Sequence, residues 1–283
     1  MLVYAQLAAL ADALAGQYTM EEAQHLARLA MQEATAWSRT QLLLNNREAL
    51  PADCAARLEA LAGRLLAGEP WQYITGRAFF CGHTFIVGSG VLVPRPETEL
   101  LVELAAMLAK QDAKILDACT GSGCVAISSA LARPDVEVHA FDISPEALAY
   151  ARQNNASLEA SVTITQDDLL VPSKALLHQR FDVVISNPPY VPQAEAASLA
   201  VHVRDHEPGL ALFAPDDDPL LFYKALEALA RQVLVPGRWL LAELHPPFAE
   251  ATLALFAEFD WMNGELVADM YGRKRVLRVQ RRA

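Results

Sequence analysis

From residue 114 onward, short apolar runs alternate with longer helix-forming segments, and this order constrains the fold more than any other feature of the sequence. Residues 181–185 (FDVVI), for example, form a short, apolar run with β-branched side chains, which is typical of a buried strand. We predict strands at residues 114–118, 136–141, 162–165, 181–186, 239–243, 265–268 and 275–280. The helical segments between strands act as crossover connections, while the last two strands have only a short connection. The pattern therefore predicts an α/β fold with a mostly parallel seven-stranded sheet, helices on both faces and an antiparallel final strand.

The first part of the chain has a different character and predicts a small helical domain over residues 1–75. It is rich in Ala, Leu, Gln and Glu, and Thr19-Met20-Glu21-Glu22 has the capping-box pattern that begins a helix. Its role is either packing alone or the recognition of a macromolecular substrate. We predict a β-hairpin linker over residues 76–94, in which Val91-Leu92-Val93 continues the strand pattern, and the sheet domain over residues 95–283.

Composition and charge disfavour several classes of protein. Hydrophobic residues make up 53% of the chain, enough for a well-formed core, and the formal net charge of -11 disfavours stable binding to nucleic acid. The four cysteines have neither CxxC nor zinc-ligand spacing, so we predict reduced thiols and no metal. We see no signal peptide and no transmembrane run, which predicts a cytoplasmic protein that does not bind membranes.

Small residues and glycines follow the first predicted strand of the sheet. This turn contains Cys119, Thr120, Gly121, Ser122 and Gly123. Such a turn lets a ligand approach the backbone closely, although it lacks the Gly-Lys-Ser/Thr ending of a triphosphate-binding loop. The alternative is a tight strand–helix turn that binds nothing.

Acidic residues end the next two predicted strands. Asp142 can accept hydrogen bonds from both hydroxyls of a ribose, Asp168 can accept from an adenine amino group, and Leu169 can pack on the ring. Either acid alone is compatible with a solvated strand end. Combined with the glycine-rich turn, they predict a nucleoside pocket, and S-adenosylmethionine fits a ligand with nucleoside and amino-acid ends.

The segment Ser186-Asn187-Pro188-Pro189-Tyr190 completes the strand 181–186 and leaves the sheet. Two prolines end the strand, because neither can donate a ladder hydrogen bond. The segment is either a proline-stiffened turn or a binding site for a planar NH₂ group. In the second case, the Asn187 side-chain oxygen and the Pro188 carbonyl accept its hydrogens, and Tyr190 lies against the planar group. This is positioning and electrostatics, with no general base.

These features resemble the class I methyltransferases, and longer motifs narrow the resemblance. Residues 68–76 (GEPWQYITG), residues 93–99 (VPRPETE), residues 187–191 (NPPYV) and residues 206–208 (HEP) occur in that order. Together they resemble the protein-(glutamine-N5) methyltransferases that modify peptide chain release factors. The resemblance implies a Rossmann-like sheet, S-adenosylmethionine as cofactor and S-adenosylhomocysteine as product.

The same resemblance implies the substrate and the roles of individual residues. The substrate would be the glutamine of the Gly-Gly-Gln loop of a release factor, and we expect a monomeric enzyme. The cofactor would contact Cys119, Thr120, Gly121, Ser122, Gly123, Asp142, Asp168, Leu169 and Asn187. The glutamine amide would be held by Asn187, Pro188, Pro189 and Tyr190.

Three alternatives stay open on the sequence. Residues 79–83 (FFCGH) and the run 119–124 (CTGSGC) look more like the related enzyme that methylates a glutamine of ribosomal protein L3. Adenine-N6 methylation of nucleic acid uses the same Asn-Pro-Pro-Tyr signature, and a basic C-terminal run, residues 273–282, is its best support. The third is a non-catalytic scaffold, although such a protein has no physical need for both Asp142 and Asn187.

Overall fold

The chain folds into two units in a computed structural model that describes residues 1–259 and 261–283. One unit comprises Met1–Gly76 together with Leu199–His206, and the other comprises Arg77–Ser198 together with Glu207–Ala283. Within the described ranges, none of the helices has both the length and the apolar character needed to cross a bilayer.

The smaller unit is built from helices. They are α1 (Val3–Leu14), α2 (Met20–Thr35), α3 (Arg39–Leu44), α4 (Ala52–Leu66), α5 (Trp71–Thr75) and α10 (Val201–Arg204). The predicted capping box is confirmed, because Glu22 N donates to Thr19 Oγ1 and the Glu22 carboxylate accepts from Thr19 N. Val3, Leu14 and Met31 are fully buried in its core, which accounts for the helical pattern of apolar residues.

The larger unit contains a seven-stranded sheet in the order β10-β11-β9-β6-β3-β4-β5. Its strands are β3 (Lys114–Ala118), β4 (Glu137–Asp142), β5 (Val162–Gln166), β6 (Phe181–Ser186), β9 (Leu234–Glu243), β10 (Trp261–Ala268) and β11 (Lys274–Arg281). β5, β4, β3, β6 and β9 are parallel, whereas β11 is antiparallel to both of its neighbours. The predicted mostly parallel sheet with an antiparallel final strand is confirmed. The strand order reverses between β3 and β6, and ligands bind open α/β sheets at such a switch point.

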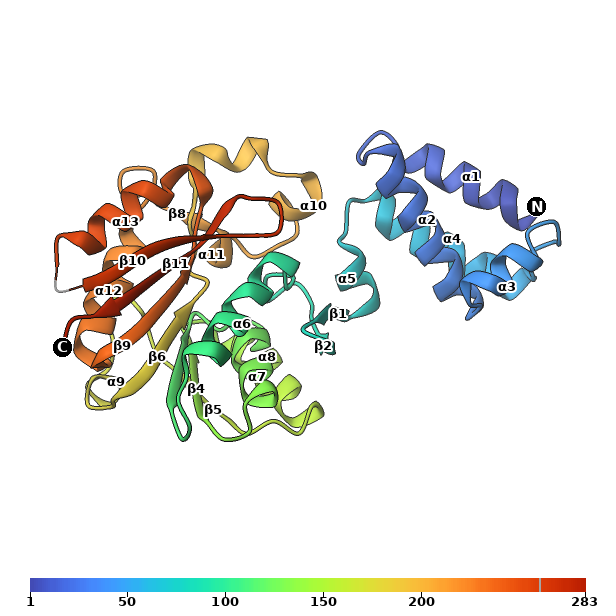
Figure 1. The fold of residues 1–283 in the computed structure, drawn as a ribbon. Coiled ribbons are helices and arrows are strands. Elements are labelled where there is room, and N and C mark those ends of the chain that lie inside the picture. Colours follow the sequence, from blue (N-terminus) through green and yellow to red (C-terminus); the bar gives the residue numbers. More distant parts are fainter. Residues whose placement is uncertain (260) are drawn as a thin grey trace. The chain divides into compact units, whose positions relative to one another are not determined.

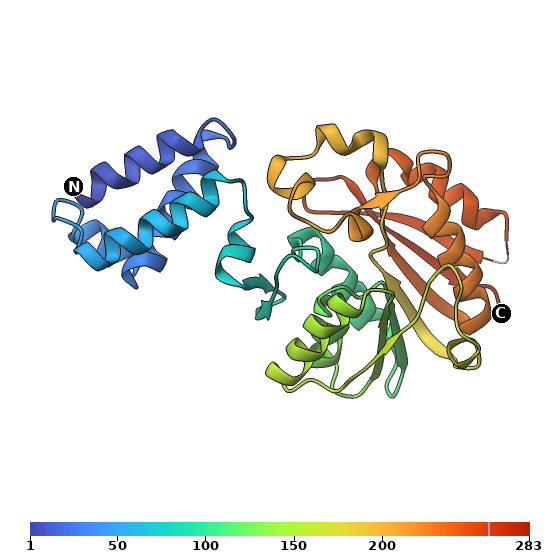
Figure 2. The same cartoon turned by 180° about the vertical axis from the view of Figure 1, so that it is seen from behind.

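Helices cover both faces of this sheet (Figure 1). α6 (Glu99–Leu108), α7 (Cys124–Ala132) and α8 (Pro145–Ser157) pack together over one face, and α12 (Leu221–Val233) and α13 (Ala249–Ala257) pack on the other (Figure 2). The core under α12 contains the buried side chains of Phe181, Tyr223 and Leu240. The shorter elements of this unit are η1 (Pro96–Thr98), α9 (Lys174–Leu177), β7 (Val191–Pro192), η2 (Gln193–Ser198), α11 (Gly209–Leu212), β8 (Phe213–Ala214) and η3 (Pro246–Phe248).

A short hairpin precedes the sheet, with β1 (Arg77–Phe80) antiparallel to β2 (His83–Ile86). The predicted continuation of the strand pattern through Val91-Leu92-Val93 is wrong, because these residues form a bend and irregular chain. The reason is a long-range contact: Val93 N donates to the Glu207 carboxylate at 3.1 Å and not to a neighbouring strand. Residues with a strand-like pattern therefore belong to a loop in this structure.

Candidate active site

Strand register brings three chain segments to one level at the carboxyl edge of the sheet. Ala118 of β3 pairs with Ser186 of β6, and Ser186 pairs with Ala242 of β9. The residues that follow these partners are Cys119, Asn187 and Glu243. Cys119 and Asn187 are the first residues after β3 and β6, and Glu243 is the last residue of β9. Neighbouring strands lie about 4.8 Å apart, so the three residues lie side by side at this edge.

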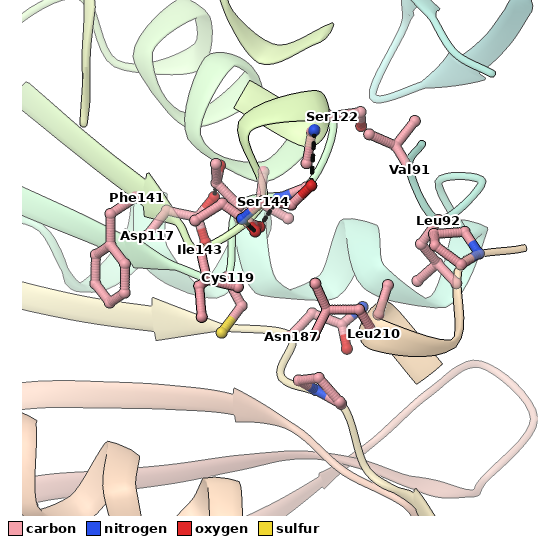
Figure 3. A pocket seen from close by; sticks show the side chains of 18 of the residues that line it. Val91, Leu92, Asp117, Cys119, Ser122, Phe141, Ile143, Ser144, Asn187 and Leu210 are labelled. Atoms are coloured by element: carbon pink, nitrogen blue, oxygen red, sulfur yellow. Dashed lines mark hydrogen bonds between the residues drawn. The ribbon is translucent and has the colours of Figure 1, made fainter. Parts of the chain in front are cut away.

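A pocket opens at this edge of the sheet (Figure 3). Asp117, Cys119 and Asn187 reach it from strand ends, Val91 and Leu92 reach it from a loop, and Leu210 reaches it from the short helix α11. Of the predicted site residues, those that line it are Cys119, Thr120, Gly121, Ser122, Asp142, Asp168, Leu169, Asn187 and Pro189. The other three predicted residues, Gly123, Pro188 and Tyr190, are not part of the lining.

The turn after β3 requires left-handed backbone at alternate residues. Cys119, Gly121 and Gly123 have φ values of 61°, 57° and 82°. A Cβ on Gly123 would lie 2.9 Å from Ile127 Cδ1 and 3.2 Å from Ala151 Cβ, so Gly123 also permits the close approach of α7 to α8. Of these three residues only Cys119 carries a side chain, and burial raises the pKa of its thiol, which disfavours the reactive thiolate.

Asp117 supports the turn from inside. Its side chain is almost fully buried and accepts hydrogen bonds from Thr120 Oγ1 at 2.7 Å and from Ala126 N at 3.2 Å. Burial raises the pKa of this carboxyl to about 7, although both hydrogen bonds oppose the rise. Asp117 therefore ties the turn to the first turn of α7.

Asp142 joins the turn to the next strand. Its Oδ2 accepts from Gly121 N at 2.8 Å and its Oδ1 accepts from Ser144 N at 2.9 Å. Burial raises the pKa of the Asp142 carboxyl, while these backbone N–H groups oppose the rise. The contacts fix both oxygens of a pocket-lining carboxylate, as a group that binds a vicinal diol requires.

Asp167 and Asp168 follow β5 but differ in their surroundings. Asp167 is occupied by its own loop, since its oxygens accept from Ser173 N at 2.9 Å and from Ser173 Oγ at 2.6 Å. Asp168 Oδ1 accepts from Leu170 N at 2.8 Å, and its neighbour Leu169 is buried with a side chain on the pocket wall. Asp168 and Leu169 thus offer one polar and one apolar contact to the same ligand.

Asn187 belongs to a hydrogen-bonded network that sequence reasoning missed. Asn187 Nδ2 donates to Thr98 Oγ1 at a long 3.5 Å, and Thr98 Oγ1 donates to Glu243 Oε2 at 2.6 Å. Tyr190 Oη donates to the other oxygen, Glu243 Oε1, at 2.9 Å, and its ring stacks on His245. Burial raises the pKa of Tyr190, which keeps the phenol protonated as a donor. The signal that would have selected Glu243 is its place at the end of a strand, which it shares with Asp142.

An ion pair between the half-buried Arg95 and the buried Glu207 holds two segments of the pocket wall together. Arg95 donates to Glu207 Oε1 at 2.5 Å, and the other Glu207 oxygen accepts from Val93 N. Glu207 is buried, which raises its pKa, while the positive charge of Arg95 opposes the rise. Arg95 is the only cation among the described residues that line the pocket, and the same lining contains four aspartates. The pocket is therefore unsuited to phosphates.

This fold is shared with a methyltransferase from Pyrococcus furiosus, whose crystal structure matches 81% of this chain and 98% of its own with a TM-score of 0.53 and 15% identity. Residues 95–204 match the methyltransferase small domain, and residues 6–76 match the PrmC N-terminal domain. With its reversed strand order and its glycine-rich turn after β3, the larger unit is a Rossmann-like methyltransferase domain.

Relatives identify the family within that class. The chain is 41% identical to the release factor glutamine methyltransferase of Bacteroides thetaiotaomicron, over 79% of this chain and 80% of the relative. It is 37% identical to the protein of the same name from Deinococcus radiodurans, over 90% of each. The chain belongs to the release factor glutamine methyltransferase family.

Proposed function

We propose that the protein transfers a methyl group from S-adenosylmethionine to the side-chain amide nitrogen of the glutamine in the Gly-Gly-Gln motif of peptide chain release factors. The observation that carries this proposal is the position of Asn187, which lines the same pocket as the glycine-rich turn and Asp142. An acceptor for an amide and a pocket for a nucleoside thus share one cavity, in a chain whose relatives are named for this reaction.

The pocket residues suit S-adenosylmethionine. Asp142 would accept from the ribose hydroxyls, Asp168 and Leu169 would border the adenine, and residues 119–123 would let the amino-acid part approach the backbone. The acidic lining favours a positively charged sulfonium over the phosphates of a dinucleotide. When bound, this cofactor supplies an electrophilic methyl group, and no metal is needed.

The protein's own groups would hold the glutamine amide for transfer. An amide nitrogen is a weak nucleophile because its lone pair is delocalised, and positive charge develops on it as the new bond forms. Asn187 Oδ1 and the Pro188 carbonyl would accept its two hydrogens, fixing its direction and stabilising that charge. Pro188 and Pro189 stiffen the segment, and Tyr190 would lie against the planar amide. The nitrogen then loses one of its protons to water.

Each unit has a part in this proposal. The helical domain, residues 1–75, would recognise the release factor, the linker at 76–94 would join the domains, and residues 95–283 would carry out methyl transfer. Action on a translation factor would take place in the cytoplasm, and the enzyme is proposed to be a monomer. Stable binding to nucleic acid is not expected, because basic residues of β11 pair with acids: Arg275 with Asp269, and Arg278 with Glu265.

The test uses the purified protein, S-adenosylmethionine and three substrates in parallel: a release factor, ribosomal protein L3 and duplex DNA. Mass spectrometry locates any added methyl group. A methyl on the Gly-Gly-Gln glutamine is the expected result. Label on L3 alone would retain the chemistry and change the substrate, whereas label on adenine would refute a protein substrate.

A further inference from the structure

We infer that Thr98 and Glu243 are positioning residues that determine which end of the Asn187 amide faces the substrate. This inference rests on the proposed function and adds to it, because neither residue touches the reacting atoms. An asparagine side chain has an acceptor and a donor end of nearly the same shape. Only the acceptor end can bind a substrate NH₂ group, so some other contact must hold the correct orientation.

The first step of the argument is the single proton of Thr98. This hydroxyl donates to Glu243 Oε2 at 2.6 Å, a short bond typical of a charged acceptor. With its proton used, Thr98 Oγ1 presents only lone pairs to Asn187. Those lone pairs select the NH₂ end of Asn187 as their partner, at 3.5 Å, and leave Asn187 Oδ1 for the substrate.

The second step is that Glu243 is itself held in place. Tyr190 Oη donates to Glu243 Oε1, so the two oxygens accept from different segments of the chain. On the other side of Tyr190, the ring of His245 stacks at 5.7 Å with an interplanar angle of 13°, and its Nε2 lies 2.9 Å from Glu195 Oε2. The carboxylate therefore connects Asn187 to Tyr190, the two ends of the Asn-Pro-Pro-Tyr segment.

The third step concerns why an acid occupies this place. Glu243 is 2% exposed, and burial raises the pKa of its carboxyl, while the hydrogen bonds from Thr98 and Tyr190 and the positive charge of Arg275 oppose the rise. A carboxylate can accept from both Thr98 and Tyr190, whereas a neutral amide has one oxygen and would have to donate to one of them. Its charge also polarises the chain of hydrogen bonds through Thr98 and makes Asn187 Oδ1 a better acceptor.

The experiment compares Thr98→Val, which keeps the shape, with Thr98→Ser, which keeps the hydroxyl. We expect Thr98→Val to lower kcat about 10- to 100-fold, the loss that follows from one hydrogen bond to a charged group. The KM for the release factor and the calorimetric Kd for S-adenosylmethionine should stay near those of the unmodified protein. Thr98→Ser should restore most of kcat.

Glu243→Gln is the second variant, and the chain offers matched controls for both. Thr252 and Glu227 are also buried and hydrogen-bonded, Thr252 Oγ1 to Phe248 O and Glu227 Oε1 to Trp261 Nε1. Glu243→Gln should lower kcat as Thr98→Val does. When the glutamine NH₂ group donates to Thr98, the Thr98 hydroxyl proton turns toward Asn187 and favours the orientation in which Asn187 Oδ1 faces Thr98 and not the substrate. Thr252→Val and Glu227→Gln should change the thermal midpoint of unfolding by similar amounts while leaving kcat unchanged.

The inference is overturned if Thr98→Val or Glu243→Gln retains the kcat of its control. It is also overturned if Thr98→Ser is as slow as Thr98→Val, which would show that packing and not the hydroxyl matters. Failure of the proposed function looks different, because the unmodified protein would then add no methyl to the release factor. The inference is tested by dividing the kcat of each variant by the kcat of the unmodified protein, both measured on the substrate that the unmodified protein methylates.

Discussion

Replacement of Asp142 by alanine is the sharpest test of the cofactor pocket. The Asp142 carboxylate is fixed by Gly121 N at 2.8 Å and by Ser144 N at 2.9 Å, and it lines the pocket at the end of β4. Alanine removes the acceptor proposed for the ribose hydroxyls and also releases these two backbone N–H groups. We therefore expect weaker binding of S-adenosylmethionine in a protein that still folds.

The size of the effect follows from the hydrogen bonds that are lost. A hydrogen bond to a charged group contributes about 1.5 to 3 kcal/mol, so losing one ribose contact should raise Kd about 10- to 150-fold. The Kd of Asp142→Asn for S-adenosylmethionine should lie between those of Asp142→Ala and the unmodified protein. Its single oxygen can accept from either Gly121 N or Ser144 N but not from both, so one backbone donor loses its acceptor.

The assay is isothermal titration calorimetry of S-adenosylmethionine at constant salt and pH, with urea unfolding to show that each variant is folded. Asp135→Ala is the control, because Asp135 is an exposed acid of the same unit that pairs with Arg133. Asp135→Ala should bind like the unmodified protein. An Asp142→Ala variant whose Kd also equals that of the control would refute the assignment of this carboxylate to the ribose.

Three further predictions use other features of the pocket. Asn187→Ala should lower kcat by about 10²- to 10³-fold with little change in calorimetric cofactor affinity, because it removes an acceptor that acts as charge develops. Asp117→Asn should raise the free energy of unfolding by on the order of 1 to 4 kcal/mol above neutral pH and should have little effect in acid. Urea unfolding across a pH series measures this difference. Gly123→Ala should destabilise by about 2 to 4 kcal/mol, from left-handed strain plus overlap with α7 and α8, whereas Gly237→Ala, which has open space and a φ of 77°, should cost about 1 kcal/mol.

The sign of the Asp117 prediction follows from its raised pKa. A carboxyl whose folded pKa is near 7 contributes most to stability when it is protonated, below the ordinary carboxyl range near 4. That contribution is lost as pH rises through about 7, and asparagine, which cannot ionise, does not lose it. If the difference in unfolding free energy between Asp117→Asn and the unmodified protein were the same at every pH, the raised pKa of Asp117 would be contradicted. Wild-type turnover by Asn187→Ala, or equal unfolding free energies for Gly123→Ala and Gly237→Ala, would contradict the other two.

Local sequence patterns predict much of the fold. β3, β4 and β6 have short, largely apolar runs, and the run of β6 is β-branched, which is typical of a buried strand. Thr19 with Glu22 marks the start of α2 through contacts three residues apart. The pattern misled at Val91-Leu92-Val93, where the partner is a carboxylate more than a hundred residues away. It also gave no sign of the two-residue parallel pair of β7 and β8, whose partners Val191 and Phe213 are set by tertiary packing.

The candidate site also contains residues that the local sequence could select and residues that only the tertiary structure reveals. The turn at 119–123 and Asp142 could be selected because they directly follow predicted strands, and the sheet then brings their carboxyl ends together. Thr98 and Glu243 are separated by 145 residues, and each has an adequate local explanation, as a helix-start residue and as a strand end. Only the register of β6 against β9 shows that Glu243, the last residue of β9, is level with Asn187 at the end of the neighbouring strand.

Charge in and around the pocket discriminates between glutamine and adenine as the methylated group. Both offer a planar NH₂ to the Asn-Pro-Pro-Tyr segment, so that segment cannot distinguish them. A flipped adenine, however, brings its backbone phosphates to the pocket entrance, where a nucleic-acid enzyme needs unpaired cations. Here Arg95 is already paired with the buried Glu207, and turning Arg95 to a phosphate would leave that buried carboxylate without its cation. A glycine-rich peptide loop carries no such charge, so it can reach Asn187 without disturbing Arg95. The ion pair therefore favours a protein substrate on grounds independent of the relatives.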